Sequence, residues 1–157
     1  MMIVGPILTL IMAFTGPLSP NAGVSWSDTQ AVLGLLATAN TDWAQINFLL
    51  LSIGLIMQVL GIRYFVNSMN SNDSVANYSL TGGMAMIMGV IVVFGEGLFY
   101  GAAANAAAIA GGAGMGTAAS MWAGGQAFGA GGSILLFLGM ALVSISCLLY
   151  TSPSPRD

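Results

Sequence analysis

Long apolar runs alternate along the chain with short polar or glycine-rich stretches. The clearest run covers residues 46–66, INFLLLSIGLIMQVLGIRYFV, and a second run of the same length covers residues 80–100. At about 1.5 Å per residue, such a run spans about 30 Å as a helix, which is the thickness of the hydrocarbon core of a bilayer. Residues 67–79 between the runs are polar and too few for another element. The pattern therefore predicts a transmembrane helical hairpin over residues 46–100.

Two weaker apolar runs flank this hairpin. The first lies in residues 1–18, where Pro6 and Pro17 bracket the apolar centre. It predicts a membrane helix near residues 3–18, with a signal peptide as the alternative, although a basic leader and a clear cleavage site are both missing. The second, SILLFLGMALVSIS at residues 133–146, predicts the start of a truncated membrane helix that reaches toward residue 150.

The segments between these runs differ in composition. Residues 19–45 mix polar and apolar positions and predict an amphipathic connection. Residues 101–132 consist almost entirely of alanine and glycine. They contain a ladder of small residues at every fourth position, formed by Ala104, Ala108, Gly112, Gly116, Ser120 and Gly124. The ladder permits close helix packing but each glycine costs a helix about 1 kcal/mol, so this segment predicts either a packing helix or an irregular loop.

Small and amide side chains recur on one face of each helix of the predicted hairpin. On the first helix, a stripe with helical spacing consists of Asn47, Gly54, Gln58 and Gly61. On the second helix, a stripe with seven-residue spacing consists of Gly82, Gly89 and Glu96. Small residues let helix backbones approach and amides seek partners across an interface, so we expect both stripes, with Gly112 and Gly116 of the ladder, to pack helices together. The two stripes are expected to face each other or a neighbouring subunit.

The composition supports a lipid environment. Hydrophobic residues make up 57% of the 157 residues and charged residues only 4%, against about 25% charged in ordinary soluble domains. A water-facing surface cannot be built from so few charges, whereas a chain that lies in lipid avoids ionisable side chains because they are costly there. We therefore expect an all-α integral membrane protein whose main partner is the lipid bilayer.

Two charged residues carry separate expectations. Arg63 is the only basic residue before residue 147, and the positive-inside rule places it, with the connection at 67–79, in the cytoplasm. Glu96 is the only carboxylate within an apolar run, and an acid in a membrane is a candidate ion-binding group. It lies four residues from the end of its run, so a solvated position near the headgroups is the alternative. In the predicted hairpin the two residues are about 21 Å apart along the axis, too far for an ion pair.

The residues that most enzymes use are scarce in this chain. It has no His, no Lys and one Cys, so it lacks a histidine base, a Walker lysine and a Schiff-base lysine. The carboxylates are too few and too scattered for a paired acid–base site. We expect a protein that is not an enzyme and that has no catalytic residues, cofactor or metal. Because it has no basic patch, we also expect it not to bind nucleic acid.

The end of the chain has a different character. Residues 147–157, CLLYTSPSPRD, resemble one translated reading frame of a transposase adapter used in preparing sequencing libraries. We therefore expect the natural sequence to stop being visible near Ser146 and the chain to be a fragment, with a genuine Ser/Pro-rich tail as the alternative. On this interpretation Cys147 carries no information about the redox compartment.

The hairpin as a whole resembles a known family. The segments IGLIMQVLGIRYFVNSMN and YSLTGGMAMIMGVIVVFGEGL, with the polar gap between them, are similar to the small hydrophobic hairpin proteins of type IV secretion and conjugation systems. The matching features lie at the end of the first helix and the start of the second: Gly61, Arg63, Tyr64, Phe65, Gly82, Gly83 and Gly89. The chain has one basic residue here, where those hairpins often have several. The resemblance covers about a third of the chain and implies a pilin-like or channel-associated subunit of a bacterial inner membrane, which works by assembly.

Two other classes stay open. A proteolipid-like rotor subunit also pairs a glycine-rich helix with a carboxylate-bearing helix and would use Glu96 to carry an ion. In this chain the order of the two helices and the depth of the acid differ from that family. A holin-like pore former agrees with the composition alone. All three classes predict a homo-oligomer or a larger membrane assembly.

Overall fold

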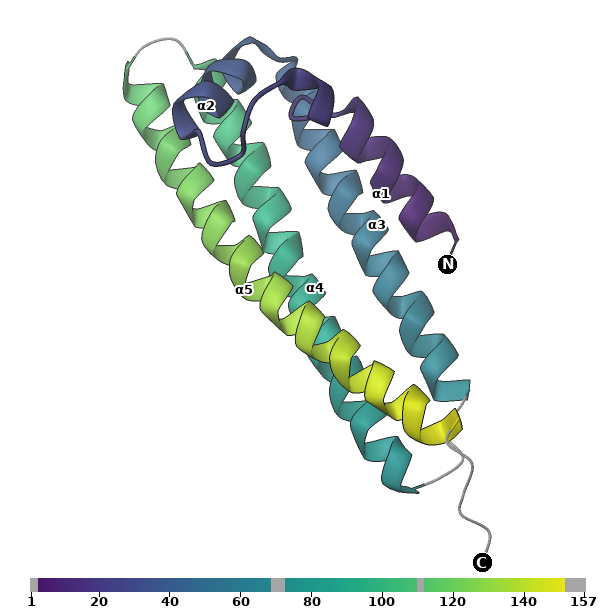
Figure 1. Cartoon of the computed structure of the whole chain (residues 1–157). Coiled ribbons are helices and arrows are strands. Elements are labelled where there is room, and N and C mark those ends of the chain that lie inside the picture. The colour runs from purple at the N-terminus through teal and green to yellow at the C-terminus, as the bar shows by residue number, and fades with distance from the viewer. Residues whose placement is uncertain (1–2, 69–72, 110–111, 152–157) are drawn as a thin grey trace, which may run out of the picture.

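A computed structural model describes residues 3–68, 73–109 and 112–151 of the chain. The elements in these ranges are all helical: α1 (Val4–Thr15), the short 3-10 helix η1 (Pro20–Ala22), α2 (Thr29–Thr38), α3 (Thr41–Ser68), α4 (Asp73–Ala108) and α5 (Gly112–Thr151). Helices α3, α4 and α5 run along one another, α1 lies along one half of α3, and α2 covers one end of the bundle (Figure 1). The prediction of an all-α fold with apolar helices of membrane length is confirmed.

Three helices are long and apolar enough to cross a membrane, over Thr41–Asn67, Asn77–Ala108 and Gly114–Leu149. The chain is thus a membrane protein. With 36 residues in α4 and 40 in α5, these helices extend about 54 Å and about 60 Å, well beyond a hydrocarbon core of about 30 Å. They therefore tilt or project from the core at one end. Helix α1 has only 12 residues and, at about 18 Å, is too short to cross alone.

Local sequence explains where the first helices begin and end. Pro17 terminates α1 because the residue before a proline avoids the helical conformation, and that residue is extended here. Asp28 caps α2, since its carboxylate accepts a hydrogen bond from the Ala31 N–H at 3.1 Å. The Asn40 side chain accepts the corresponding bond from the Trp43 N–H at 3.0 Å, at the start of α3.

Glycine sets the distance between α4 and α5. A Cβ added at Gly89 would lie 2.8 Å from the carbonyl oxygen of Gly132, and one added at Gly132 would lie 2.8 Å from the carbonyl oxygen of Gly89. Gly82 and Gly139 meet in the same way further along the pair, at 2.8 Å and 2.7 Å. Any other residue at these four positions would press a side chain on the facing backbone, so the helices approach this closely only because the residues are glycine.

Helix α1 packs antiparallel against the first half of α3 (Figure 1). Here too glycine permits a close approach, because a Cβ added at Gly5 would lie 2.8 Å from the carbonyl oxygen of Gly54. At the other end of α1, the indole N–H of Trp43 donates to the carbonyl oxygen of Thr15 at 3.2 Å. That carbonyl is one of those that a helix end leaves without an intrahelical partner.

Two buried clusters hold the bundle together. At the α2 end, small alanine side chains of α4 and α5 surround two large rings, those of Tyr100 and Trp122, and α2 covers them with Val32, Leu33 and Leu36. At the other end, larger aliphatic side chains of α3, α4 and α5 meet: Val59, Val66, Met86, Val90 and Val143. The amphipathic α2 therefore closes the part of the bundle whose own side chains are smallest.

Residues 101–132 form neither one helix nor one loop. Residues up to Ala108 continue α4, and α5 begins at Gly112, so the ladder of small residues is divided between two helices. The run at 133–146 lies within the second half of α5, so the helix that contains it begins earlier than predicted, at Gly112. The connection predicted at 67–79 is also shorter, because α3 extends to Ser68 and α4 begins at Asp73. Alanine favours helix, and close packing of α4 on α5 offsets the cost of the glycines.

Candidate functional site

Aromatic rings gather where the loop before α2 meets α3, α4 and α5. The centroid of the Trp26 ring lies 5.8 Å from that of Tyr100 and 5.6 Å from that of Trp122. The rings of Tyr100 and Trp122 are stacked at 4.2 Å, and Phe48 of α3 adds a fourth ring 5.5 Å from Tyr100. We call these four residues the aromatic cluster. Tryptophan and tyrosine favour the boundary between lipid and water, so the cluster is suited to one membrane interface.

Glu96 lies one helical turn from Tyr100 on α4, and three polar side chains join α4 to α5 here. The Glu96 carboxylate accepts a hydrogen bond from the Tyr100 hydroxyl, which in turn accepts one from Nε2 of Gln126 at 2.8 Å. The carboxylate also occupies the position that a Cβ would take at Gly129. Glu96 is half-buried. This differs from the solvated position near a helix end that the sequence suggested, because α4 continues to Ala108.

Glu96 lines a cavity of about 90 Å³, which we call the Glu96 cavity. Trp26, Phe48 and Tyr100 of the aromatic cluster form part of its wall, and aliphatic side chains form most of the rest: Leu51, Leu55 and Val93. The Ser52 hydroxyl, also in the wall, donates to the carbonyl oxygen of Phe48 at 3.0 Å. Glu96 is the only charged side chain that lines this cavity.

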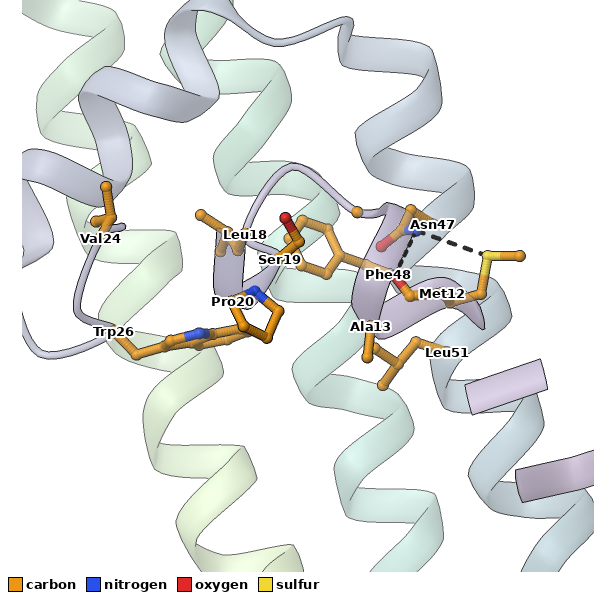
Figure 2. A pocket seen from close by; sticks show the side chains of 11 residues that line it. Met12, Ala13, Leu18, Ser19, Pro20, Val24, Trp26, Asn47, Phe48 and Leu51 are labelled. Carbon is orange, nitrogen blue, oxygen red and sulfur yellow. Dashed lines mark hydrogen bonds between the residues drawn. The ribbon is translucent and has the colours of Figure 1, made fainter. Parts of the chain in front are cut away.

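A larger cavity of about 370 Å³, which we call the loop cavity, lies between α1, α3 and the loop that leads to α2 (Figure 2). It shares three lining residues with the Glu96 cavity, namely Trp26, Phe48 and Leu51. Asn47 lies in its α3 wall, where Nδ2 donates to the carbonyl oxygen of Met12 at 2.9 Å (Figure 2). The two cavities together offer an apolar volume with a single carboxylate at one side.

The predicted stripe of α3 lies against α1. Gly54 meets Gly5, and Asn47 bonds to the end of α1. A Cβ added at Gly5 would also lie 2.7 Å from the backbone nitrogen of Gln58. The Gln58 side chain itself lines a small space between α3, α4 and α5, and Gly61 is buried. Most members of this stripe therefore lie at the contact between α3 and α1.

The predicted stripe of α4 lies against α5. Gly82 and Gly89 meet the α5 backbone, and Glu96 meets the backbone at Gly129. The two stripes therefore face different helices and do not face each other, because α4 packs on α5 more closely than on α3. In the ladder, Gly116 is exposed and a Cβ there would meet no atom within 4 Å, so it packs no helices together in the described part of the chain. Gly112 begins α5, and its surroundings lie outside the described residues.

Arg63 lies near the end of α3 that is far from α2. Its guanidinium group rests over Gly83 of α4, where an added Cβ would lie 2.7 Å from Nη1. Gly83 and Glu96 belong to the same helix and are separated along it by about 20 Å. The arginine and the glutamate are therefore placed apart, as the sequence suggested, and Arg63 marks the end of the bundle opposite the aromatic cluster.

A groove of about 390 Å³, the α3–α4 groove, lies between α3 and α4 and shares one lining residue, Gly97, with the Glu96 cavity. It is lined by Gln45, Ile46, Leu49, Gly97, Leu98, Gly101, Ala102 and Asn105. Its small residues leave the helix backbones open to approach, and no charged side chain lines it. Among the residues that the structure describes, the side chains of Gln45 and Asn105 have no hydrogen-bond partner.

Two parts of this arrangement were not predicted from the sequence: the α5 glycines that face α4, and the contact of Trp26 with Tyr100. The α5 glycines that face α4 do carry a signal, since Gly125, Gly129, Gly132 and Gly139 recur with helical spacing. Trp26 carries none, because it lies in a loop and reaches Tyr100 only through the packing of the whole chain.

The sequence matches no known family model, no curated protein and no solved structure.

Proposed function

We propose that this protein is a non-enzymatic subunit of a membrane assembly in which copies of the chain pack head to tail. The observation that carries the proposal is the α3–α4 groove. It is neutral, three of its eight lining residues are glycine or alanine, and it holds two amide side chains without a partner among the described residues. A helix suits such a groove better than acyl chains do, because small residues allow close approach and the amides gain hydrogen bonds.

The outer face of α5 from a second copy is the occupant that fits this groove. Gly124 packs against the Phe99 ring, which places the first half of α5 beside the part of α4 that lines the groove. One exposed stripe of α5 at this level consists of small residues, Gly116, Ser120, Ala123 and Ala127, although Gln126 and Phe128 beside it are exposed as well. Its second half instead presents large apolar side chains suited to lipid: Ile134, Phe137, Leu138 and Ile145. Contact between two different faces at the same level repeats from copy to copy and forms a ring where the rotation between copies closes.

More specifically, we propose that the chain is a pilin-like or channel-associated subunit of a type IV secretion or conjugation system in a bacterial inner membrane. Its support is the resemblance of the hairpin, whose matching segments correspond to the second half of α3 and the middle of α4. A role that consists of assembly also agrees with the scarcity of catalytic side chains.

Cysteine crosslinking between two differently tagged chains tests the assembly. Both chains carry Cys147→Ser, one carries Ala102→Cys in the groove, and the other carries Ala123→Cys on the outer face of α5. We expect a disulfide between the two tags on mild oxidation in membranes. The control pair replaces Ala123→Cys with Phe137→Cys, which is 68% exposed on the lipid-suited half of α5. Absence of the first crosslink, or equal crosslinking of the control pair, would refute the head-to-tail contact.

One observation favours a second function, that of a proteolipid-like subunit that carries a proton on Glu96. The carboxyl group is held between α4 and α5 by Tyr100 and Gly129, and it lines a mostly apolar cavity. Dicyclohexylcarbodiimide, which modifies protonated carboxyl groups in apolar surroundings, tests this. A proton-carrying Glu96 should be labelled, less so as the pH rises, and Glu96→Gln should abolish labelling. An unlabelled Glu96 at acidic pH would rule this function out.

A further inference from the structure

We propose that the Glu96 cavity and the loop cavity together bind an organic monocation of the quaternary ammonium or phosphonium type. Glu96 is the counter-ion in this proposal, and Trp26, Phe48 and Tyr100 contact the apolar substituents of the ligand. The site belongs to one chain, so it does not depend on the head-to-tail assembly. The second function uses the same carboxylate, that of Glu96. The two hypotheses differ in what the carboxylate binds, a proton in one and an organic cation in the other.

The charge of the site favours a cation of single charge. Glu96 is the one charged side chain that lines either cavity. Arg63, the one basic residue among those that the structure describes, lies over Gly83 at the other end of the bundle. A carboxylate in a mostly apolar cavity attracts a counter-ion strongly, because water does not screen the charge there. One negative charge calls for one positive charge.

The walls of the site favour an organic cation over a metal ion. Three aromatic residues, Trp26, Phe48 and Tyr100, line the same cavity as Glu96. Aromatic faces attract cations within about 6 Å and are the usual partners of quaternary ammonium groups. A metal ion such as Ca²⁺ takes about six to eight oxygen ligands, whereas the side-chain oxygens in this wall come from Glu96, Tyr100 and Ser52 alone.

The volume is sufficient for such a ligand. The loop cavity measures about 370 Å³, which falls within the range of about 300–1,000 Å³ typical of small-molecule sites. Because Trp26, Phe48 and Leu51 line both cavities, a ligand in the loop cavity can place its charged centre toward Glu96. A lipophilic cation concentrates at a membrane interface, and the aromatic cluster suits that level of the bilayer.

Binding of tetraphenylphosphonium to the purified full chain in lipid nanodiscs tests this proposal. Binding is measured by equilibrium dialysis of the radiolabelled ion, and empty nanodiscs correct for partition into lipid. We expect one ion per chain and at least a tenfold weaker affinity for Glu96→Gln, which keeps the shape and removes the charge. The matched control is Asp42→Asn, which removes an exposed carboxylate at the start of α3 outside both cavities and should bind as the wild type does. No binding above empty nanodiscs, or equal binding by Glu96→Gln, would overturn the proposal.

Three further measurements keep the result independent of folding and of the other proposals. Trp26→Leu keeps the charge but removes one aromatic face, so it should weaken tetraphenylphosphonium binding several-fold and leave labelling of Glu96 by dicyclohexylcarbodiimide in place. Triphenylphosphine oxide, a neutral probe of similar shape, should bind wild type and Glu96→Gln equally weakly. Affinity of the wild type for the cation should rise with pH as protons leave the carboxyl group, whereas that of Glu96→Gln should stay flat. If Glu96 is labelled but tetraphenylphosphonium fails to slow the labelling, the proton function stands and the organic-cation site is refuted.

Discussion

Two adjacent glycines of α5 allow the close packing of α4 and α5 to be measured directly. Gly132 faces α4, where an added Cβ would lie 2.6 Å from Cγ2 of Val93 and 2.8 Å from the carbonyl oxygen of Gly89. Gly131 is exposed, and a Cβ there would meet no atom within 4 Å. The substitutions Gly132→Ala and Gly131→Ala therefore add the same methyl group at nearly the same depth of the same helix, and only the first meets a neighbour.

The size of the effect follows from these distances. Ordinary contact begins near 3.4 Å, so the Gly89 backbone, at 2.8 Å, would have to move by about 0.6 Å. Val93 gives little relief because a β-branched side chain has one favoured rotamer in a helix. Overpacking of this kind costs about 1–3 kcal/mol, while the gain in helix propensity, about 1 kcal/mol, is common to both variants. Gly132→Ala should therefore be less stable than Gly131→Ala by about 1–3 kcal/mol, which is about 5- to 140-fold in the unfolding equilibrium.

Unfolding of both variants in mixed micelles of dodecyl maltoside and sodium dodecyl sulfate, followed by far-UV circular dichroism, measures this difference. Gly131→Ala should unfold at the same or a slightly higher fraction of sodium dodecyl sulfate than the wild type, and Gly132→Ala should unfold at a lower fraction than Gly131→Ala. Equal stability of the two variants would show that α4 and α5 do not meet through Gly89 and Gly132, and the packing argument would then be wrong.

Two further predictions concern the ends of the bundle. Asn47→Leu removes the hydrogen bond to the end of α1, which is worth about 1–2 kcal/mol in a membrane. Amide hydrogen exchange should therefore accelerate in α1 and not in α4. The control Ile46→Ala, at an exposed neighbouring position, should leave amide exchange in α1 unchanged. The positive-inside rule places the Arg63 end of the bundle in the cytoplasm. In a Cys147→Ser background, an impermeant maleimide added to intact cells should therefore label Ser25→Cys but not Tyr64→Cys. The reverse labelling pattern would show that the chain has the opposite orientation in the membrane.

Local sequence was sufficient for the broad architecture. Apolar runs of about 20 residues have one stable form in lipid, the helix, because every backbone polar group must find a partner within the segment. For this reason the hairpin over residues 46–100 and the all-α class could be predicted from the spacing of apolar residues. The helical spacing of Gly54, Gly82 and Gly89 likewise identified positions that the structure places in helix contacts, because periodicity alone determines which side chains share a face.

Only the tertiary structure decided which faces meet. A stripe of small residues shows that a helix can be approached closely, but it does not determine which helix packs there. In the structure the stripe of α3 contacts α1, whereas the stripe of α4 contacts α5. The continuation of α4 beyond Tyr100 was hidden in the alanine- and glycine-rich segment, whose helicity depends on packing against α5 and α2 and not on propensity alone. The surroundings of Glu96 were equally inaccessible to sequence reasoning, because Trp26, Phe48 and Gly129 come together around it from three separate parts of the chain. Local pattern determines secondary structure and exposure, whereas the chemistry of a site depends on contacts between residues far apart in sequence.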